Sequence, residues 1–250
     1  MKRLTGHMGR LFALGVFALL LAACARGEPP SGIQDPYEER NRAVHEANLA
    51  VDRAFLRGAG EGVARLPKPL RTGLSNFSSN FSLPQTVVND LLQLRIEDAL
   101  HNTFRLAVNT TVGLGGLLDP ATEMGIEERP SDFGETLYVW GVPEGNYVVH
   151  PIIGPSTERR TVGMVVDLFT DPLGYLLPSP ERHAGKLAAA VAAVGSRGDY
   201  GSEVEAILYE SADSYAQARL IYLENRRHLL GSGATAEDSY FDPYEDLYVE

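Results

Sequence analysis

The sequence predicts a mainly helical protein. Its apolar residues recur chiefly every third or fourth position, which is the spacing of one helical face, and the pattern is clearest over residues 96–108. Capping residues and helix breakers stand where this spacing begins and ends, and only residues 137–153 favour strands. Because there is no internal repeat and the helical pattern continues to Gly231, we expect one domain over residues 35–231.

The first helix is predicted to begin at Asp35. This aspartate can accept backbone hydrogen bonds as a cap, Pro36 suits the first helical position, and Glu38 stands three residues after the cap. Glycines and two prolines interrupt residues 58–69, so we expect that segment to be irregular. Ser82 then offers a second cap, which predicts a short separate helix after it.

The middle of the chain combines a strong helix with an uncharged loop. Residues 96–108 predict an amphipathic helix, and residues 110–118 follow it with three glycines and no charge. Glycine costs chain entropy and has no side chain to bury, so this loop suits close approach of the backbone to lipid or to another helix. A buried glycine-rich turn is the alternative interpretation.

The second half of the chain predicts one hairpin and two helical regions. Two apolar runs, 137–142 and 147–153, are separated by Pro-Glu-Gly-Asn and favour a short hairpin. Residues 162–177 return to helical spacing, with a break expected at Pro172.

The last helix is predicted to begin at a capping box formed by Ser202 and Glu205. Its first turn is acidic and its last turn is basic, which complements the helix dipole, and Gly231 provides the stop. Residues 232–250 contain acidic residues and no basic residue, so we expect a disordered acidic tail.

The N-terminus has the pattern of a lipoprotein signal peptide over residues 1–23. Basic residues precede the apolar run 11–23, which as a helix would span only about 20 Å and is too short for a hydrocarbon core of about 30 Å. The run ends in Leu-Ala-Ala before Cys24, which resembles a bacterial lipobox. We therefore expect cleavage before Cys24, lipidation of its thiol, and a short linker over residues 24–34.

Charge and cysteine content exclude several classes of protein. The formal net charge is −11, and it becomes −14 when a signal with three basic and no acidic residues is removed. This balance argues against binding nucleic acid or anionic lipid through a basic surface. Cys24 is the only cysteine, so we expect no disulfide, no Cys/His metal site and no cofactor.

No enzyme motif is complete in the sequence. Residues 132–134 spell the kinase tripeptide Asp-Phe-Gly, but the glycine-rich loop and the His-Arg-Asp segment of kinases are absent. The glycines of residues 113–116 lack the last glycine of a dinucleotide-binding loop. The prediction is that the protein is not an enzyme, and a lipid hydrolase is disfavoured because no nucleophile has a matching base.

Several ordered segments together resemble the MlaA (VacJ) lipoprotein family. The similarity covers roughly residues 35–171, and its segments include Asp-Pro-Tyr-Glu at 35–38, Arg-Thr-Gly-Leu-Ser-Asn-Phe at 71–77, Val-Asn-Asp-Leu-Leu-Gln at 88–93, Asn-Thr-Thr-Val-Gly-Leu-Gly-Gly-Leu-Leu-Asp-Pro at 109–120, Asp-Phe-Gly-Glu-Thr-Leu at 132–137 and Gly-Pro-Ser at 154–156. Departures occur at Arg40, Asn146 and His150, where the family usually has an apolar residue, a proline and an aliphatic residue, respectively.

The resemblance implies a helical ring embedded in the inner leaflet of the outer membrane, on the periplasmic side and held by lipid. Family members are thought to remove stray phospholipids from the outer leaflet through an amphipathic channel and to pass them to the soluble periplasmic carrier MlaC. They often lie beside trimeric porins. A porin trimer, MlaC and phospholipid are therefore the expected partners.

The uncharged loop supplies the candidate lipid-path or membrane-facing residues. They are Thr110, Thr111, Gly113, Gly115, Gly116 and Leu117. The main alternative function is a scaffold lipoprotein that binds porins and transports nothing.

Overall fold

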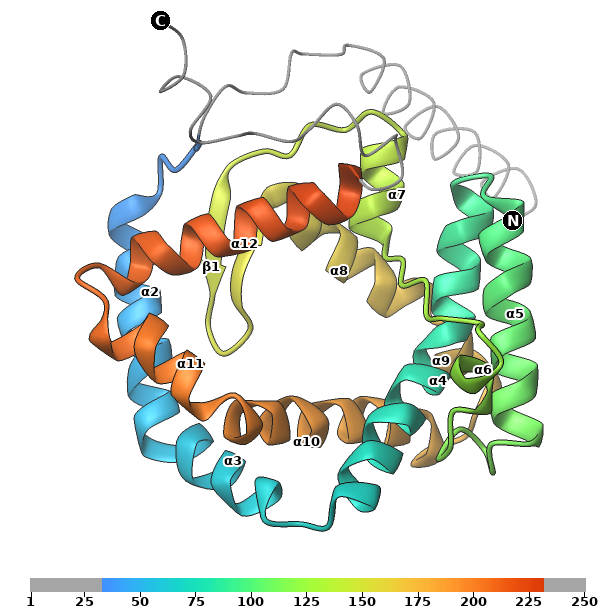
Figure 1. Cartoon of the computed structure of the whole chain (residues 1–250). Helices are drawn as coiled ribbons and strands as arrows, with labels where there is room; N and C mark the ends of the chain where they lie inside the picture. Colours follow the sequence, from blue (N-terminus) through green and yellow to red (C-terminus); the bar gives the residue numbers. More distant parts are fainter. Residues whose placement is uncertain (1–32, 232–250) are drawn as a thin grey trace, which may run out of the picture.

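The computed structural model describes residues 33–231, and its helices follow one another around a ring (Figure 1). The lipidation site Cys24, the signal peptide, most of the linker and the acidic tail lie outside the described residues. The elements, in order, are α2 (Glu38–Val51), the π-helix η1 (Asp52–Leu56), α3 (Arg57–Ala64), α4 (Lys68–Leu92), α5 (Ile96–Thr111), α6 (Pro120–Glu123), α7 (Phe133–Val139), β1 (Tyr147–His150), β2 (Gly154–Thr157), α8 (Glu158–Thr170), α9 (Pro172–Leu176), the 3₁₀-helix η2 (Glu181–His183), α10 (Ala184–Asp199), α11 (Gly201–Glu205), the π-helix η3 (Ala206–Glu210) and α12 (Ser214–Gly231). The prediction of a mainly helical, ring-like domain is confirmed.

The ring is closed by contacts between the start and the end of the described chain. Asp35 does not cap α2, which begins at Glu38 without a side-chain cap, so that prediction was wrong. Its carboxylate instead accepts hydrogen bonds from Tyr215 and Arg219 of α12 and from Asn41 of α2. A charged partner on a distant helix outcompetes the local cap, because an ion-paired hydrogen bond is about twice as strong as a neutral one.

The segment expected to be irregular is helical as far as Ala64. Its glycines allow α3 to lie directly against α10, because a Cβ added at Gly60 would lie 2.9 Å from the backbone nitrogen of Gly198. Close packing therefore offsets the low helix propensity of glycine. The short separate helix predicted after Ser82 was also wrong, since α4 continues through Pro84 and the Ser82 hydroxyl donates to the carbonyl of Ser79.

The predicted hairpin was displaced along the chain. The first half of the run 137–142 lies in α7, which Asp132 caps by accepting from the backbone nitrogen of Glu135 at 3.0 Å. The observed hairpin pairs β1 with β2, with Tyr147 opposite Thr157. Two residues near its turn, Ile152 and Gly154, have positive φ.

The break at Pro172 is confirmed, because α8 ends at Thr170 and Asp171 caps α9. The prediction of one continuous last helix was wrong, since residues 211–213 separate η3 from α12. The sequence pattern gave no expectation for residues 184–199, which form α10 along one side of the ring, beside α3 (Figure 1).

A buried apolar cluster lies between the hairpin and α12. Tyr147, Val149, Tyr215 and Leu223 form it, and Val44 of α2 packs against it. Within the described residues, no helix is both long and apolar enough to cross a membrane.

Candidate functional site

The described part of the chain has an inverted distribution of polarity. Buried polar or charged side chains outnumber buried apolar ones there, while large apolar side chains are exposed on α4, α5, α7, α8, α9, α10 and α12. In a water-soluble domain the apolar face of each helix is expected to be the buried one. The exposed apolar surface therefore marks a region that contacts a membrane or another protein.

Helix α5 shows the inversion most clearly. Its apolar residues Ile96, Leu100 and Phe104 lie one turn apart and are 53%, 66% and 50% exposed. The opposite face carries Asn102 and Arg105, and both side chains are buried. The predicted amphipathic helix is correct, and its polar face is the one that packs against the protein.

A buried polar seam joins α5 to α4. The Asn102 amide donates to Asp90 at 2.8 Å and to the carbonyl of Arg129 at 3.0 Å. Burial raises the pKa of the Asp90 carboxyl to about 6, against the hydrogen bond from Asn102 and the positive charge of Arg95. Arg95 in turn pairs with Glu135 at 2.6 Å, which ties the α4–α5 corner to α7.

The glycine-rich loop 110–118 is a tight turn fastened to α4. The Asn80 amide donates to the Thr110 hydroxyl at 3.2 Å, and the Asn76 amide donates to the carbonyl of Leu117 at 3.3 Å. Thr111 is exposed, and its hydroxyl donates to the carbonyl of Ala107.

The three glycines of this loop have different surroundings. A Cβ added at Gly113 would lie 2.4 Å from the carbonyl of Asn109, and one at Gly116 would lie 2.6 Å from the Asn80 side chain. Gly115 faces open space, although its φ of +72° disfavours other residues. The loop is thus a close-packed turn at Gly113 and Gly116, whereas its side chains Leu114 and Leu117 are exposed. Its contact with lipid stays a prediction.

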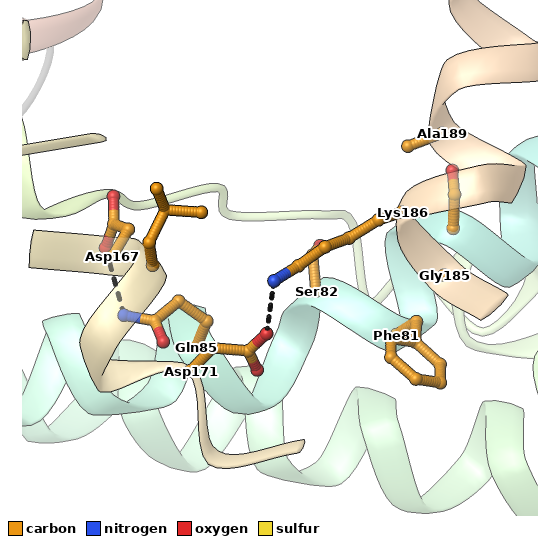
Figure 2. Close-up of a pocket in the computed structure, with 10 residues that line it drawn as sticks. Phe81, Ser82, Gln85, Asp167, Asp171, Gly185, Lys186 and Ala189 are labelled. Carbon is orange, nitrogen blue, oxygen red and sulfur yellow. Dashed lines mark hydrogen bonds and ion pairs between the residues drawn. The ribbon is translucent and has the colours of Figure 1, made fainter. Parts of the chain in front are cut away.

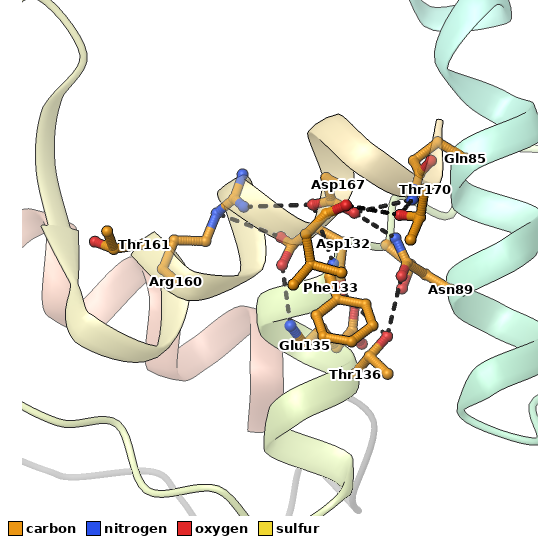
Figure 3. Close-up of polar contacts among 12 residues, drawn as sticks. Gln85, Asn89, Asp132, Phe133, Glu135, Thr136, Arg160, Thr161, Asp167 and Thr170 are labelled. Carbon is orange, nitrogen blue, oxygen red and sulfur yellow. Dashed lines mark hydrogen bonds and ion pairs between the residues drawn. The ribbon is translucent and has the colours of Figure 1, made fainter. Parts of the chain in front are cut away.

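A second polar cluster lies where α4, α7, α8 and α12 meet (Figure 3). Arg226 of α12 donates to both oxygens of Asp132 at 2.8 and 2.9 Å. Burial acts to raise the pKa of the Asp132 carboxyl, but the hydrogen bonds from Arg226 and the charge of Arg160 outweigh it and hold the pKa below its ordinary value. The chance kinase tripeptide therefore has a structural role.

The same cluster extends to Asp167 of α8. Its carboxylate accepts from Gln85 at 2.9 Å and from Asn89 at 3.1 Å, both on α4, and from the backbone nitrogen of Phe133. One guanidinium nitrogen of Arg160 is buried without a hydrogen bond and lies 3.8 Å from Asp167. Polar contacts of this kind hold α8 against the ring while its apolar side chains stay exposed.

A cavity of about 210 Å³ opens beside this cluster, between α4, α8 and α10 (Figure 2). Phe81 and Leu168 contribute apolar surface to it, and Leu168 is 65% exposed. Lys186 of α10 also lines the cavity and is paired with Asp171 at 3.0 Å. Asp167 lines the cavity too, so the single ammonium group lies beside two carboxylates. An apolar wall next to such charged groups suits an amphiphile with a charged head.

Sequence reasoning missed Lys186 and the whole of α10. A signal was available, because Lys68 and Lys186 are the only lysines after residue 2. Within the described residues, no group of three or more His, Cys, Asp or Glu could hold a metal ion.

Comparisons with known proteins agree with this architecture. The family model described as MlaA lipoprotein matches residues 33–229. The intermembrane phospholipid transport system lipoprotein MlaA of Haemophilus influenzae is 30% identical over 93% of this chain and 94% of its own length. The Escherichia coli K12 protein of the same name is 30% identical over 90% of each chain. An uncharacterized protein of Rickettsia bellii is 32% identical over 75% of this chain and 73% of its own length.

One solved structure, from work on the structural basis for maintenance of bacterial outer membrane lipid asymmetry, superposes with a TM-score of 0.67 at 30% identity. The matched region covers 78% of this chain and 98% of the chain in that structure.

A helical ring with exposed apolar stripes and buried polar seams defines a membrane-associated amphipathic protein. More specifically, the chain belongs to the MlaA lipoprotein family. This family is one of lipid-transport lipoproteins, as the names of its characterised relatives state.

Proposed function

We propose that this protein is an outer-membrane lipoprotein that removes mislocalised phospholipids from the outer leaflet and passes them to a periplasmic carrier. The observation that carries the proposal is the inverted polarity of the ring, in which α5 and α8 expose apolar stripes and bury polar ones. The relatives named as phospholipid transport lipoproteins also support a role in phospholipid transport.

The energetics of lipid transfer explain why such a surface is needed. Each methylene moved from hydrocarbon into water costs about 0.8 kcal/mol, so two acyl chains together cost on the order of 25 kcal/mol to expose. A phospholipid therefore needs a continuous apolar surface along its path. Its headgroup needs polar partners at the same time, because an unpaired polar group in hydrocarbon is also costly.

The cavity at Lys186 combines both requirements. Phe81 and Leu168 can contact acyl chain, while the Lys186 ammonium can contact a lipid phosphate and is kept in place by Asp171. A lysine suits a transient phosphate contact, because its flexible point charge lacks the bidentate geometry of arginine.

The membrane position follows from the same surface. The exposed stripe of α5 and the exposed leucines of the 110–118 loop would lie in the inner leaflet, with Thr110 and Thr111 at the polar end of the loop. Lipid on Cys24 would hold the protein there. A porin trimer is the proposed neighbour in the membrane, and MlaC is the proposed recipient of the lipid.

The test is lipid analysis and transfer with the full-length lipoprotein purified from membranes. We expect copurified phospholipid and its transfer to purified MlaC. Lys186→Gln should slow transfer, while Arg182→Gln, an exposed cation outside the cavity, should leave the rate unchanged. Porin binding without any bound or transferred lipid would contradict the proposal and favour the scaffold alternative.

A further inference from the structure

A second cavity, of about 500 Å³, is lined by residues of α3, the first turns of α4 and the end of α10. Figure 1 shows the course of these three helices. Its apolar wall includes Val63, Leu74 and Val191. Gly195 keeps it open on one side, because a Cβ there would lie 2.9 Å from the Val63 side chain. The volume is large enough for a lipid headgroup with the beginning of its acyl chains.

Charge in this cavity is distributed unevenly. Arg71 is paired with Asp199, which compensates its charge, and its Nε also donates to the backbone carbonyl of Leu66 at 3.2 Å. Lys68 has no ion pair or hydrogen bond from its ammonium among the described residues. The cavity is therefore left with one uncompensated positive charge, although the whole chain has a net charge of −11.

The two lysines that follow the signal peptide line two different cavities between α4 and α10. Lys186 lines the smaller cavity and Lys68 lines the larger one. Every other cation of the described domain is an arginine or a histidine. The same choice of residue at both places is consistent with a shared task, for which a compact and flexible ammonium is suited.

The surroundings of Lys68 are those of a group at a membrane interface. Leu66 and Leu70, two residues before and after it, are 45% and 62% exposed. Thr72 and Ser75 add hydroxyl groups to the cavity wall. A lysine between exposed leucines can place its ammonium at the level of lipid phosphates while the leucines contact acyl chain.

We propose that this cavity binds the phosphate of a membrane glycerophospholipid through Lys68, with the lipid's acyl chains on Leu66 and Leu70. It is a second lipid site, separate from the one at Lys186, and it rests on the proposed phospholipid-transport function. With two lysine sites along the α4–α10 interface, one site can hold a lipid while a lipid leaves the other site.

The test is site-specific photo-crosslinking of the full-length protein in cells grown with radiolabelled phosphate. The crosslinker p-benzoyl-phenylalanine replaces Tyr200, which lines the larger cavity, or Leu168, which lines the smaller one. We expect labelled phospholipid on the protein at both positions. Lys68→Gln should lower the label at position 200 about fivefold and leave it unchanged at position 168. Arg65→Gln, an exposed cation three residues away and outside the cavity, is the matched control.

The outcomes separate this inference from the proposed function. Label at position 168 without label at position 200 would overturn the second site and leave phospholipid transport standing. Absence of label at both positions would contradict transport as well. A crosslink from position 200 to a protein instead of to phospholipid would overturn the lipid site, as would an equal loss of label in the Lys68 and Arg65 variants.

Discussion

Asp90 is predicted to make the protein less stable as the pH rises. The carboxyl is 1% exposed between α4 and α5 and has a pKa raised to about 6, compared with 3.8 for an ordinary aspartate. The buried Oδ1 of Asn102 has no hydrogen-bond donor, and a proton on Asp90 would offer one. Asp98, Glu135 and the cation Arg95 are the charged groups that act on it.

The sign and size of the effect follow from proton linkage. Between about pH 4 and about pH 6 the folded protein keeps the Asp90 proton that the unfolded chain releases, so the free energy of unfolding falls with rising pH through this window. A difference of about two pKa units corresponds to on the order of 3 kcal/mol, because each unit is worth about 1.4 kcal/mol. Above about pH 6 the loss is complete and the contribution is constant.

The perturbation is Asp90→Asn, which keeps the shape and the acceptor for Asn102 and removes the titration. The unfolding free energy of the variant minus that of the wild type should increase from about pH 4 to about pH 6, because only the wild type loses stability there. The measurement is denaturant unfolding in detergent at several pH values. Asp213→Asn is the control, because that carboxyl is exposed and Arg42 holds its pKa at about 2, below the window. If Asp90→Asn and the wild type change in parallel across the window, the folded and unfolded states release the Asp90 proton at the same pH and the reasoning is refuted.

Three further predictions concern the turn, the ring closure and the anchor. Gly116→Leu should lower protein abundance, because its Cβ would lie 2.6 Å from Asn80 at a φ of +93°. Gly115→Trp points into open space and should disturb outer-leaflet lipid asymmetry at near-normal abundance. Gly115→Ala is the control for backbone strain at this position. Arg226→Ala should lower the unfolding free energy by about 3–5 kcal/mol, because it removes the bidentate ion pair with Asp132. An unchanged melting temperature would contradict this. Cys24→Ser should abolish retention in washed outer membranes, because stable anchoring needs more than one acyl chain, and full retention would show that embedded apolar faces suffice.

Local patterns predicted the elements whose stability is local. The helix over residues 96–108 and the break at Pro172 both appeared where expected, because apolar periodicity and the missing backbone N–H of proline act within a few residues. The family resemblance added the ring and the transport class, which no composition or spacing indicated.

Long-range contacts decided the elements that the patterns missed. Helix α3 forms despite three glycines because Gly60 lies directly against Gly198, which is far away in the sequence. Asp35 pairs with Arg219 and does not cap α2, and α4 runs through Pro84 while it packs mainly on α5 and α10. In each case the competing partner is more than a hundred residues away or on another element, so no local window contains it.

The sequence by itself determined that this protein is mainly helical and acidic, and that α5 has one apolar and one polar face; export stays a prediction. Only the tertiary structure decided which face is buried. Periodicity reports that two faces differ, but the partner of each face depends on what the rest of the chain places beside it. Here Asp90 of α4 lies opposite Asn102, so the polar face of α5 packs inward and its apolar stripe is left for a membrane or a partner.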